Sequence, residues 1–311
     1  MRHRLLAAVA AGTLAVSLVA CSNGSSTGTS PASSGSAMSK TTEKVTVVAS
    51  TNVWGSVAKV VAGDMAEVTP IITKPTQDPH DYEATAQDKL VFSKAKIAIV
   101  NGGGYDDWAT KLATTSASKP TLIDAVETSG LKKDGEADFN EHVFYSMATA
   151  RKVAEVVATD LGKADPANAA KYTENAKSFG TTMDTLIAKA KKVGAAHAGA
   201  TAVATEPVVG YLLADMGIKN ITPDEFVEQS ETDAGPSTKV VDETTKLLTD
   251  KKASVLLVNA QTTDDVSKRL VAAAEKAKVP TVGTHETFPE GVTTYDDFVG
   301  KTIDAIGAAL K

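Results

Sequence analysis

The chain has 311 residues, a single cysteine and a formal net charge of −6 at pH 7. This acidic balance argues against a nucleic-acid-binding protein, because such proteins present a basic face to the phosphate backbone. A single cysteine excludes a disulfide within the chain and a metal site built from several thiolates. The length is sufficient for two small domains.

The first twenty residues have the pattern of an export signal. Arg2 and Arg4 precede an apolar run over residues 5–20, which is shorter than a comfortable membrane span. The run ends in Leu-Val-Ala followed by Cys21, which resembles a bacterial lipobox. This implies cleavage before Cys21 and lipid on that residue, since stable anchoring needs two lipid signals. The alternative is a plain signal peptide that leaves an incidental cysteine.

Residues 21–43 are expected to form a flexible tether. They are rich in Ser, Thr, Gly and Ala and have almost no large apolar side chains, so they cannot bury enough surface to fold. Cleavage of the signal removes Arg2 and Arg4, which leaves 30 of the 32 basic residues. With 38 acidic residues, the formal net charge of the mature chain is −8. We therefore expect an acidic folded body that can move near a membrane surface.

Strand and helix patterns alternate over residues 44–164, which predicts an N-terminal α/β domain there. The expected strands cover residues 45–49, 66–72, 97–100 and 121–124, and the expected helices cover residues 53–62 and 86–95. Residues 102–104 are three glycines after the third strand, but the P-loop ending and the Rossmann spacing are both missing. We interpret them as a tight turn, with Tyr105 and Trp108 at the edge of the sheet.

Residues 78–83 read Asp-Pro-His-Asp-Tyr-Glu and follow the strand predicted over residues 66–72. Ligands of open α/β sheets bind beyond the carboxyl ends of strands. His80 is therefore a candidate metal ligand, since imidazole is the commonest protein metal ligand and the adjacent carboxylates can orient it or neutralise charge. The same six residues are also compatible with a solvated acidic turn. His142, within Asn-Glu-His, is by itself compatible with an ordinary polar residue at a helix start.

A long helix is predicted over residues 166–196. Asp165 can cap its amino end, Pro166 suits its first turn, and apolar residues then recur at alternating spacings of three and four up to Val193. A helix of this length extends for about 45 Å, which is longer than one small domain. Residues 165–198 are therefore expected to be a rigid spine that links two domains.

The alternation of strands and helices begins again after this spine. The expected strands cover residues 201–204, 220–222, 255–258 and 280–282, and the expected helices cover residues 208–216, 235–249 and 266–277. Glu206 and Glu286 directly follow two of these strands, as His80 does in the first domain. Residues 199–311 are thus a second α/β domain. The predicted fold class is α/β, with two small domains of parallel sheets joined by the spine helix.

Several motifs, taken in this order and spacing, resemble the substrate-binding lipoproteins of zinc and manganese ABC importers, the cluster A-I family. They run from about residue 45 to about residue 298, nearly the whole body. They are the Asp-Pro-His segment at residues 78–83, Val-Asn-Gly at 100–102, the long helix, Thr-Glu-Pro at 205–207, Asn-Ala-Gln-Thr at 259–262 and Glu-Thr-Phe-Pro at 286–289.

The resemblance implies a metal held in the cleft between the two domains by two side chains from each. The positions that match the family's ligands are His80, His142, Glu206 and Glu286. Glu141 departs from the pattern, because the family usually has proline there, and it adds negative charge beside His142. His285 precedes Glu286 and is a possible fourth or additional ligand.

Two neutral imidazoles and two carboxylates balance the charge of a divalent cation. Carboxylate oxygens shift preference toward Mn²⁺, whereas Zn²⁺ binds more tightly by intrinsic affinity, so either is the expected ligand. The resemblance implies a monomer that is lipid-anchored through Cys21 to the outer face of the bacterial cell membrane. It would deliver the metal to an ABC permease, without catalysis, organic cofactor or nucleic acid.

Two other classes of function are compatible with parts of the sequence. A surface adhesin would share the lipid anchor and the exposure, but it would not need ligands from both domains. A metallohydrolase would need an open metal position for water and a nearby base such as Glu83 or His285, and four protein ligands leave little room for that water.

Overall fold

A computed structural model describes residues 43–133, 135, 139–230, 232, 234–262 and 264–311. The predicted export signal, Cys21 and all of the predicted tether except its last residue lie outside these described residues. Residues 43–311 form one unit of the chain. Within the described part of this unit, no helix combines the length and the apolar character needed to cross a membrane.

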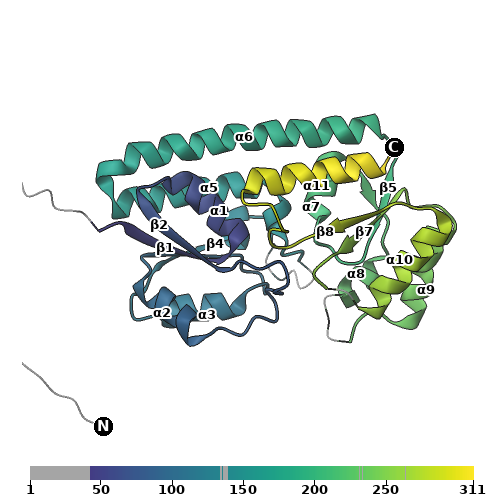
Figure 1. Ribbon diagram of the computed structural model, residues 1–311, viewed down its shortest axis with the longest axis horizontal. Helices are drawn as coiled ribbons and strands as arrows, with labels where there is room; N and C mark the ends of the chain where they lie inside the picture. The colour runs from purple at the N-terminus through teal and green to yellow at the C-terminus, as the bar shows by residue number, and fades with distance from the viewer. Residues whose placement is uncertain (1–42, 134, 136–138, 231, 233, 263) are drawn as a thin grey trace, which may run out of the picture. The chain divides into compact units, whose positions relative to one another are not determined.

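The first half of this unit is built on a four-stranded parallel sheet with the strand order β2-β1-β3-β4 (Figure 1). Its strands are β1 (Val45–Thr51), β2 (Ala66–Ile72), β3 (Ile97–Val100) and β4 (Thr121–Asp124), and its helices are α1 (Asn52–Ala62), α2 (Ala86–Lys94), α3 (Asp107–Thr115) and α4 (Ala125–Ser129). Helices cover both faces of the sheet, so β3 is a continuous apolar run with every residue buried. We call this sheet, with helices α1 to α4 and the later helix α5 (Met147–Ala164), the first lobe.

The second half repeats this topology with the strand order β6-β5-β7-β8, and we call it the second lobe. Its strands are β5 (Thr201–Ala204), β6 (Lys219–Asn220), β7 (Val255–Asn259) and β8 (Thr281–Thr284), and its helices are α7 (Gly210–Met216), α8 (Asp224–Ser230), α9 (Thr238–Thr249), α10 (Asp265–Ala277) and α11 (Tyr295–Ala309). The predicted fold class of two parallel-sheet α/β domains with a long helix is confirmed.

The sixth strand was predicted over residues 220–222, and this extent is wrong, because the strand ends at Asn220. The backbone N–H of Thr222 donates to the side chain of Asn220, 3.0 Å away, and the Thr222 hydroxyl accepts from the backbone N–H of Ala204, 2.8 Å away. Side-chain hydrogen bonds therefore take the place of strand pairing at this point.

The segment between the two sheets contains two α-helices, and the first of them, α5, was not predicted. Its elements are the short 3-10 helix η1 (Val143–Tyr145), α5 (Met147–Ala164), the 3-10 helix η2 (Pro166–Asn168) and α6 (Ala169–Ala196). The predicted start of the spine is wrong by one turn, because residues 166–168 are a 3-10 turn and Asp165 does not cap the helix. The Asp165 carboxylate instead accepts hydrogen bonds from Asn168 and Tyr172, at 2.6 and 2.9 Å.

Helix α6 contacts α5 and α1 of the first lobe and α7 and α11 of the second (Figure 1). One cluster of buried apolar residues accordingly continues from the first lobe through α6 into the second, as Val57, Leu186 and Ile303 illustrate. The helix therefore links the lobes by packing along its length. The rigidity of the spine and the domain boundaries at residues 164–165 and 198–199 remain predictions.

Helix α6 closely approaches the second lobe at Gly194. A Cβ atom added there would lie 1.5 Å from the backbone oxygen of Met216, at the end of α7, and backbone cannot move aside as a side chain can. A Cβ added at Gly180 on the same helix would lie 3.2 Å from the Nε atom of Arg151, which is a flexible side chain. Glycine is therefore required at Gly194 by the backbone of α7, whereas the side chain near Gly180 can move to make room for a methyl group.

We expect Gly194→Ala to lower the free energy of unfolding by about 2–3 kcal/mol, because the clash forces α6 and α7 apart. Gly180→Ala should leave stability unchanged or raise it by up to about 1 kcal/mol, since alanine favours the helix. Urea denaturation followed by circular dichroism measures both. Equal stability of the two variants would contradict the packing at Gly194.

Candidate metal centre

Three of the four predicted ligands meet where the two lobes face each other. His80 follows β2, His142 precedes η1, and Glu286 follows β8. One nitrogen or oxygen atom from each lies within 4.8 Å of the others. The predicted clustering of strand-end residues from both lobes is therefore present for these three, and Glu206 lies outside the trio.

His142 is buried and its ring is oriented by Asn140. The backbone N–H and the ring Nδ1 of His142 lie 3.0 and 2.9 Å from the Asn140 side-chain oxygen. That oxygen can only accept, so Nδ1 carries the proton and Nε2 keeps a lone pair. Burial lowers the pKa of His142 to about 4, which keeps the ring neutral. A neutral, oriented imidazole with a free Nε2 is the form that binds a metal.

Glu286 presents one carboxylate oxygen to His142. Its Oε1 accepts a hydrogen bond from Asn259 at 2.7 Å, whereas Oε2 lies 3.9 Å from His142 Nε2. Among the hydrogen bonds of the described residues, neither Oε2 nor Nε2 has a partner, although both atoms are buried. Burial raises the pKa of Glu286 to about 7. Two orphaned buried acceptors are costly unless something positive lies between them.

His80 is the most accessible of the three, with 30% of its side chain exposed. Its Nδ1 lies 3.0 Å from Asp78 Oδ1 and its Nε2 lies 3.3 Å from Glu141 Oε1. Burial by itself lowers the pKa of His80, but the carboxylates of Asp78, Glu141 and Glu286 outweigh it and raise the pKa to about 11. Without a metal, His80 is therefore the cation that balances this acidic site.

Glu206 is held beside the trio and not within it. Asn259 Nδ2 donates to Glu206 Oε2 at 2.5 Å and also to Glu286, so this amide bridges the two carboxylates. The Thr262 hydroxyl donates to the other oxygen of Glu206. Burial raises the pKa of Glu206. Glu206 would need to rotate away from Thr262 to become a fourth ligand.

The structure does not bring the side chain of His285 into the trio. His285 and Glu286 are adjacent residues in the segment after β8, and only the Glu286 carboxylate reaches the two histidines. Burial lowers the pKa of His285, and its backbone carbonyl accepts a hydrogen bond from Tyr145 Oη at 2.9 Å. The geometry thus favours Glu286 over His285 as the ligand.

Aromatic residues around His80 were not recognised as part of the site. Tyr105 was expected at the sheet edge, but it is buried with its ring centre 4.7 Å from that of His80. Trp108 donates a hydrogen bond to the carbonyl of Pro79 at 3.1 Å and so supports the loop before His80. Asn259 was noted as part of a motif, but its bridging role depends on two loops meeting. No local pattern in the sequence predicts any of these contacts.

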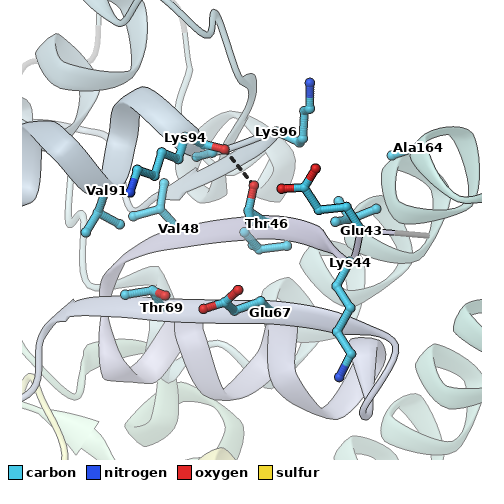
Figure 2. A pocket seen from close by; sticks show the side chains of 13 residues that line it. Glu43, Lys44, Thr46, Val48, Glu67, Thr69, Val91, Lys94, Lys96 and Ala164 are labelled. Atoms are coloured by element: carbon cyan, nitrogen blue, oxygen red, sulfur yellow. Dashed lines mark hydrogen bonds between the residues drawn. The ribbon is translucent and has the colours of Figure 1, made fainter. Parts of the chain in front are cut away.

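A hollow lies at the amino ends of β1 and β2, away from the trio (Figure 2). Its volume is about 730 Å³, and it is lined mainly by aliphatic, lysine and threonine side chains, with Thr46 Oγ1 donating to the Lys94 carbonyl at 2.7 Å. Ligands of open α/β sheets bind at the opposite, carboxyl ends of strands. The trio is therefore the better candidate for the functional site.

Comparison with known proteins identifies a matching family. The family model described as zinc-uptake complex component A, periplasmic, matches residues 47–309 of the chain. The manganese-binding lipoprotein MntA of Halalkalibacterium halodurans is 28% identical over 141 residues, which cover 44% of this chain and 45% of that protein. The manganese ABC transporter substrate-binding lipoprotein PsaA of Streptococcus anginosus is 26% identical over 189 residues, 57% of each. The chain thus spans about half the length of these relatives.

The fold also matches solved structures. The periplasmic zinc-binding protein TroA from Treponema pallidum superimposes with a TM-score of 0.73 at 18% sequence identity, over 86% of this chain and 99% of that one. At this level of identity the likeness establishes the fold alone.

Metal binding at this site should release protons, because His80 must lose its proton before it can coordinate. One proton is displaced from His80 for each metal bound, so we expect the dissociation constant to rise about tenfold when the pH falls from 8 to 7. The rise should be steeper near pH 6, where Glu286 also binds a proton. Calorimetry in buffers of different ionisation enthalpy measures the number of protons released. A dissociation constant that is constant from pH 6 to pH 8 would contradict the protonation state assigned to His80.

Proposed function

Because this chain belongs to the family of the periplasmic zinc-uptake complex component A, we propose that it captures a divalent transition metal and delivers it to an ABC permease. The observation that carries the proposal is the pair of buried, unpartnered atoms at the lobe interface. His142 Nε2 and Glu286 Oε2 face each other 3.9 Å apart, which leaves room for an ion bound to both. Ligand sites in proteins occur preferentially at interfaces between domains.

The proposed ligands are the four residues that the sequence suggested, namely His80, His142, Glu206 and Glu286. Three of them already lie together, and the metal would displace the proton from His80. Glu206 would become the fourth ligand by rotating away from Thr262, drawn by the positive charge of the ion. The Asn259 amide, which now bridges the two glutamates, would then orient Glu286 as a hydrogen-bonded neighbour of the ligands.

The donor set fits Mn²⁺ or Zn²⁺. Imidazole nitrogen suits zinc and several other transition metals, whereas carboxylate oxygen also suits manganese, and no thiolate is present to select a softer ion. The relatives named above are manganese-binding proteins, which favours manganese by analogy, while intrinsic affinity favours zinc. We propose that the metal available outside the cell decides between the two.

The site is better suited to holding an ion than to catalysis. Four protein ligands fill a tetrahedral coordination sphere and leave little room for the water that a metallohydrolase activates. The family consists of solute-binding proteins, so a capture function needs no additional chemistry. In this proposal, lipid on Cys21 keeps a monomer at the outer face of the bacterial cell membrane, near the permease.

The ligand assignment predicts one tight binding site for Mn²⁺ or Zn²⁺. In calorimetric titrations of the metal-stripped body from about Thr42 onward, His80→Ala and Glu286→Ala should each weaken binding by at least about a hundredfold. Glu206→Gln should weaken it by about tenfold, because this residue must first break its hydrogen bond to Thr262.

Two remote variants provide the control for these titrations. His197 lies beyond the end of α6 and Glu155 lies on an exposed turn of α5, so His197→Ala and Glu155→Ala should bind as the wild type does. The proposed function fails if the wild-type protein binds neither metal, or if all the variants bind equally well.

Membrane attachment is predicted to depend on Cys21. The Cys21→Ser variant cannot carry lipid on this side chain, so it should move from the detergent phase to the aqueous phase in a Triton X-114 partition of the producing cells. Its metal affinity should be unchanged, because the site lies within residues 43–311. Retention of the variant in the detergent phase would argue for another anchor.

A further inference from the structure

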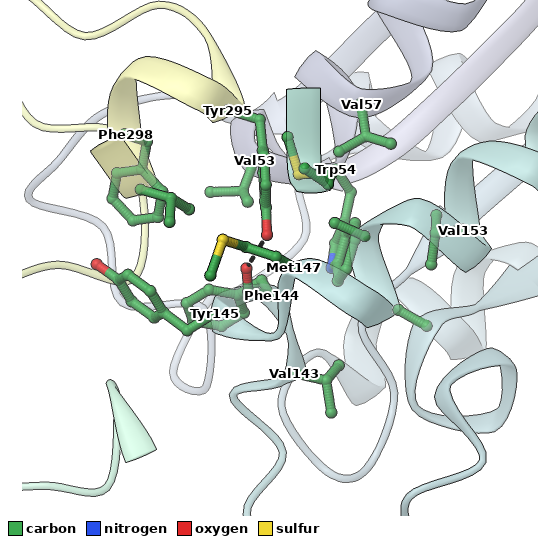
Figure 3. Packing of buried hydrophobic residues seen from close by; sticks show 14 of the residues in the cluster. Val53, Trp54, Val57, Val143, Phe144, Tyr145, Met147, Val153, Tyr295 and Phe298 are labelled. Atoms are coloured by element: carbon green, nitrogen blue, oxygen red, sulfur yellow. Dashed lines mark hydrogen bonds between the residues drawn. The ribbon is translucent and has the colours of Figure 1, made fainter. Parts of the chain in front are cut away.

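Two tyrosine hydroxyls cross the lobe interface directly beside the buried metal ligands. Tyr145, the last residue of η1, donates from Oη to the backbone carbonyl of His285 at 2.9 Å. Tyr295, the first residue of α11, donates in the opposite direction to the backbone carbonyl of Phe144 at 2.7 Å (Figure 3). One bond therefore joins η1 to the loop after β8, and the other joins η1 to the start of α11.

The bonded segments are the ones that carry the two buried ligands. Tyr145 is the third residue after His142, and the carbonyl that it binds belongs to the residue immediately before Glu286. The turn η1 is short and all three of its residues are buried, so a shift of Tyr145 would carry His142 with it. The Tyr145 hydroxyl thus fixes the loop of Glu286 relative to the turn of His142.

The surroundings make this bond difficult to replace with water. Tyr145 is fully buried, with its ring centre 5.1 Å from that of Phe298 on α11 and 5.4 Å from that of Phe144. The acceptor belongs to His285, which is half-buried, and the donor belongs to a fully buried side chain, so loss of this bond costs more than loss of the same bond between two exposed groups. The His285 loop would therefore relax when the hydroxyl is removed.

We propose that Tyr145 is a positioning residue for the metal: it sets the spacing between His142 Nε2 and Glu286 Oε2. This inference rests on the proposed function. It concerns the two buried ligands, which a tyrosine hydroxyl holds to each other across the interface. The loop of His80 is bonded separately, by Trp108 of the first lobe at Pro79 and by Gln261 of the second lobe at Gln77. A metal ion would therefore meet His142 and Glu286 at a spacing fixed before it binds.

The test is Tyr145→Phe, which removes the hydroxyl and keeps the ring. The matched control is Tyr172→Phe, because Tyr172 is also fully buried and its hydroxyl binds the Asp165 carboxylate, far along the chain from the site. We expect Tyr145→Phe to release Mn²⁺ or Zn²⁺ about tenfold faster than the wild type, as the loss of one buried hydrogen bond allows. Tyr172→Phe should release either metal within about twofold of the wild-type rate.

Two further readouts separate positioning from a general loss of stability. The gain in melting temperature on adding metal should shrink for Tyr145→Phe but not for Tyr172→Phe. The visible absorption bands of bound Co²⁺, which report ligand geometry, should shift for Tyr145→Phe alone. If Tyr145→Phe does not fold, Tyr295→Phe takes its place with the same expectations, because it cuts the other bond to η1.

The outcomes also distinguish this inference from the proposed function. A wild-type protein that binds neither metal overturns both. A wild type that binds tightly, with Tyr145→Phe matching it in release rate and Co²⁺ spectrum, overturns the inference alone. Equal weakening by Tyr145→Phe and Tyr172→Phe also overturns it, since the effect would then follow from stability.

Discussion

The burial of a carboxylate oxygen and an imidazole nitrogen face to face is the constraint on which the rest of the site depends. His142 Nε2 and Glu286 Oε2 have lost water and have gained no hydrogen bond among the described residues, which is unfavourable for both. Their other polar atoms are fully engaged, by Asn140 on one side and Asn259 on the other. Keeping two lone pairs directed at one point therefore lowers the stability of the folded protein, and a bound divalent cation would restore that stability.

The architecture explains how this arrangement is maintained. Each lobe has the same parallel sheet topology, and in both a candidate ligand lies beyond the carboxyl end of a strand, His80 after β2 and Glu286 after β8. Each lobe has a smaller apolar cluster of its own, but one further cluster is shared, because it passes from the first lobe through α6 to α11. The close approach of Gly194 to α7 and the hydroxyl bonds of Tyr145 and Tyr295 are parts of this shared interior. A site shared between two lobes can be held at a fixed spacing only if the lobes are held as well.

Much of the fold could be predicted from the sequence, because local patterns specify it. Alternating apolar runs and capping residues gave most of the strands and the helices between them, and the regular spacing of apolar residues gave α6. Helix α5 was not predicted, although its sequence carries local signals for a helix: Ser146 caps its amino end, and buried apolar residues such as Val153, Val157 and Leu161 recur along it. The start of α6 was wrong because the Asp165 carboxylate bonds Tyr172 and Asn168 instead of capping the helix, a choice made by side-chain packing.

For the site, the sequence by itself determined which residues are chemically able to bind a metal and that they follow strands in both halves. The resemblance to a known family nominated His80, His142, Glu206 and Glu286, whereas the residues alone left a solvated turn at His80 and an ordinary polar residue at His142 open. Only the tertiary structure decided that three of them form a trio while Glu206 is held aside, and that Glu286 and not His285 points inward. It also decided the roles of Asn259 and Tyr145. These are contacts between segments more than a hundred residues apart or between separate loops, and their geometry depends on how the lobes pack, which no local pattern records.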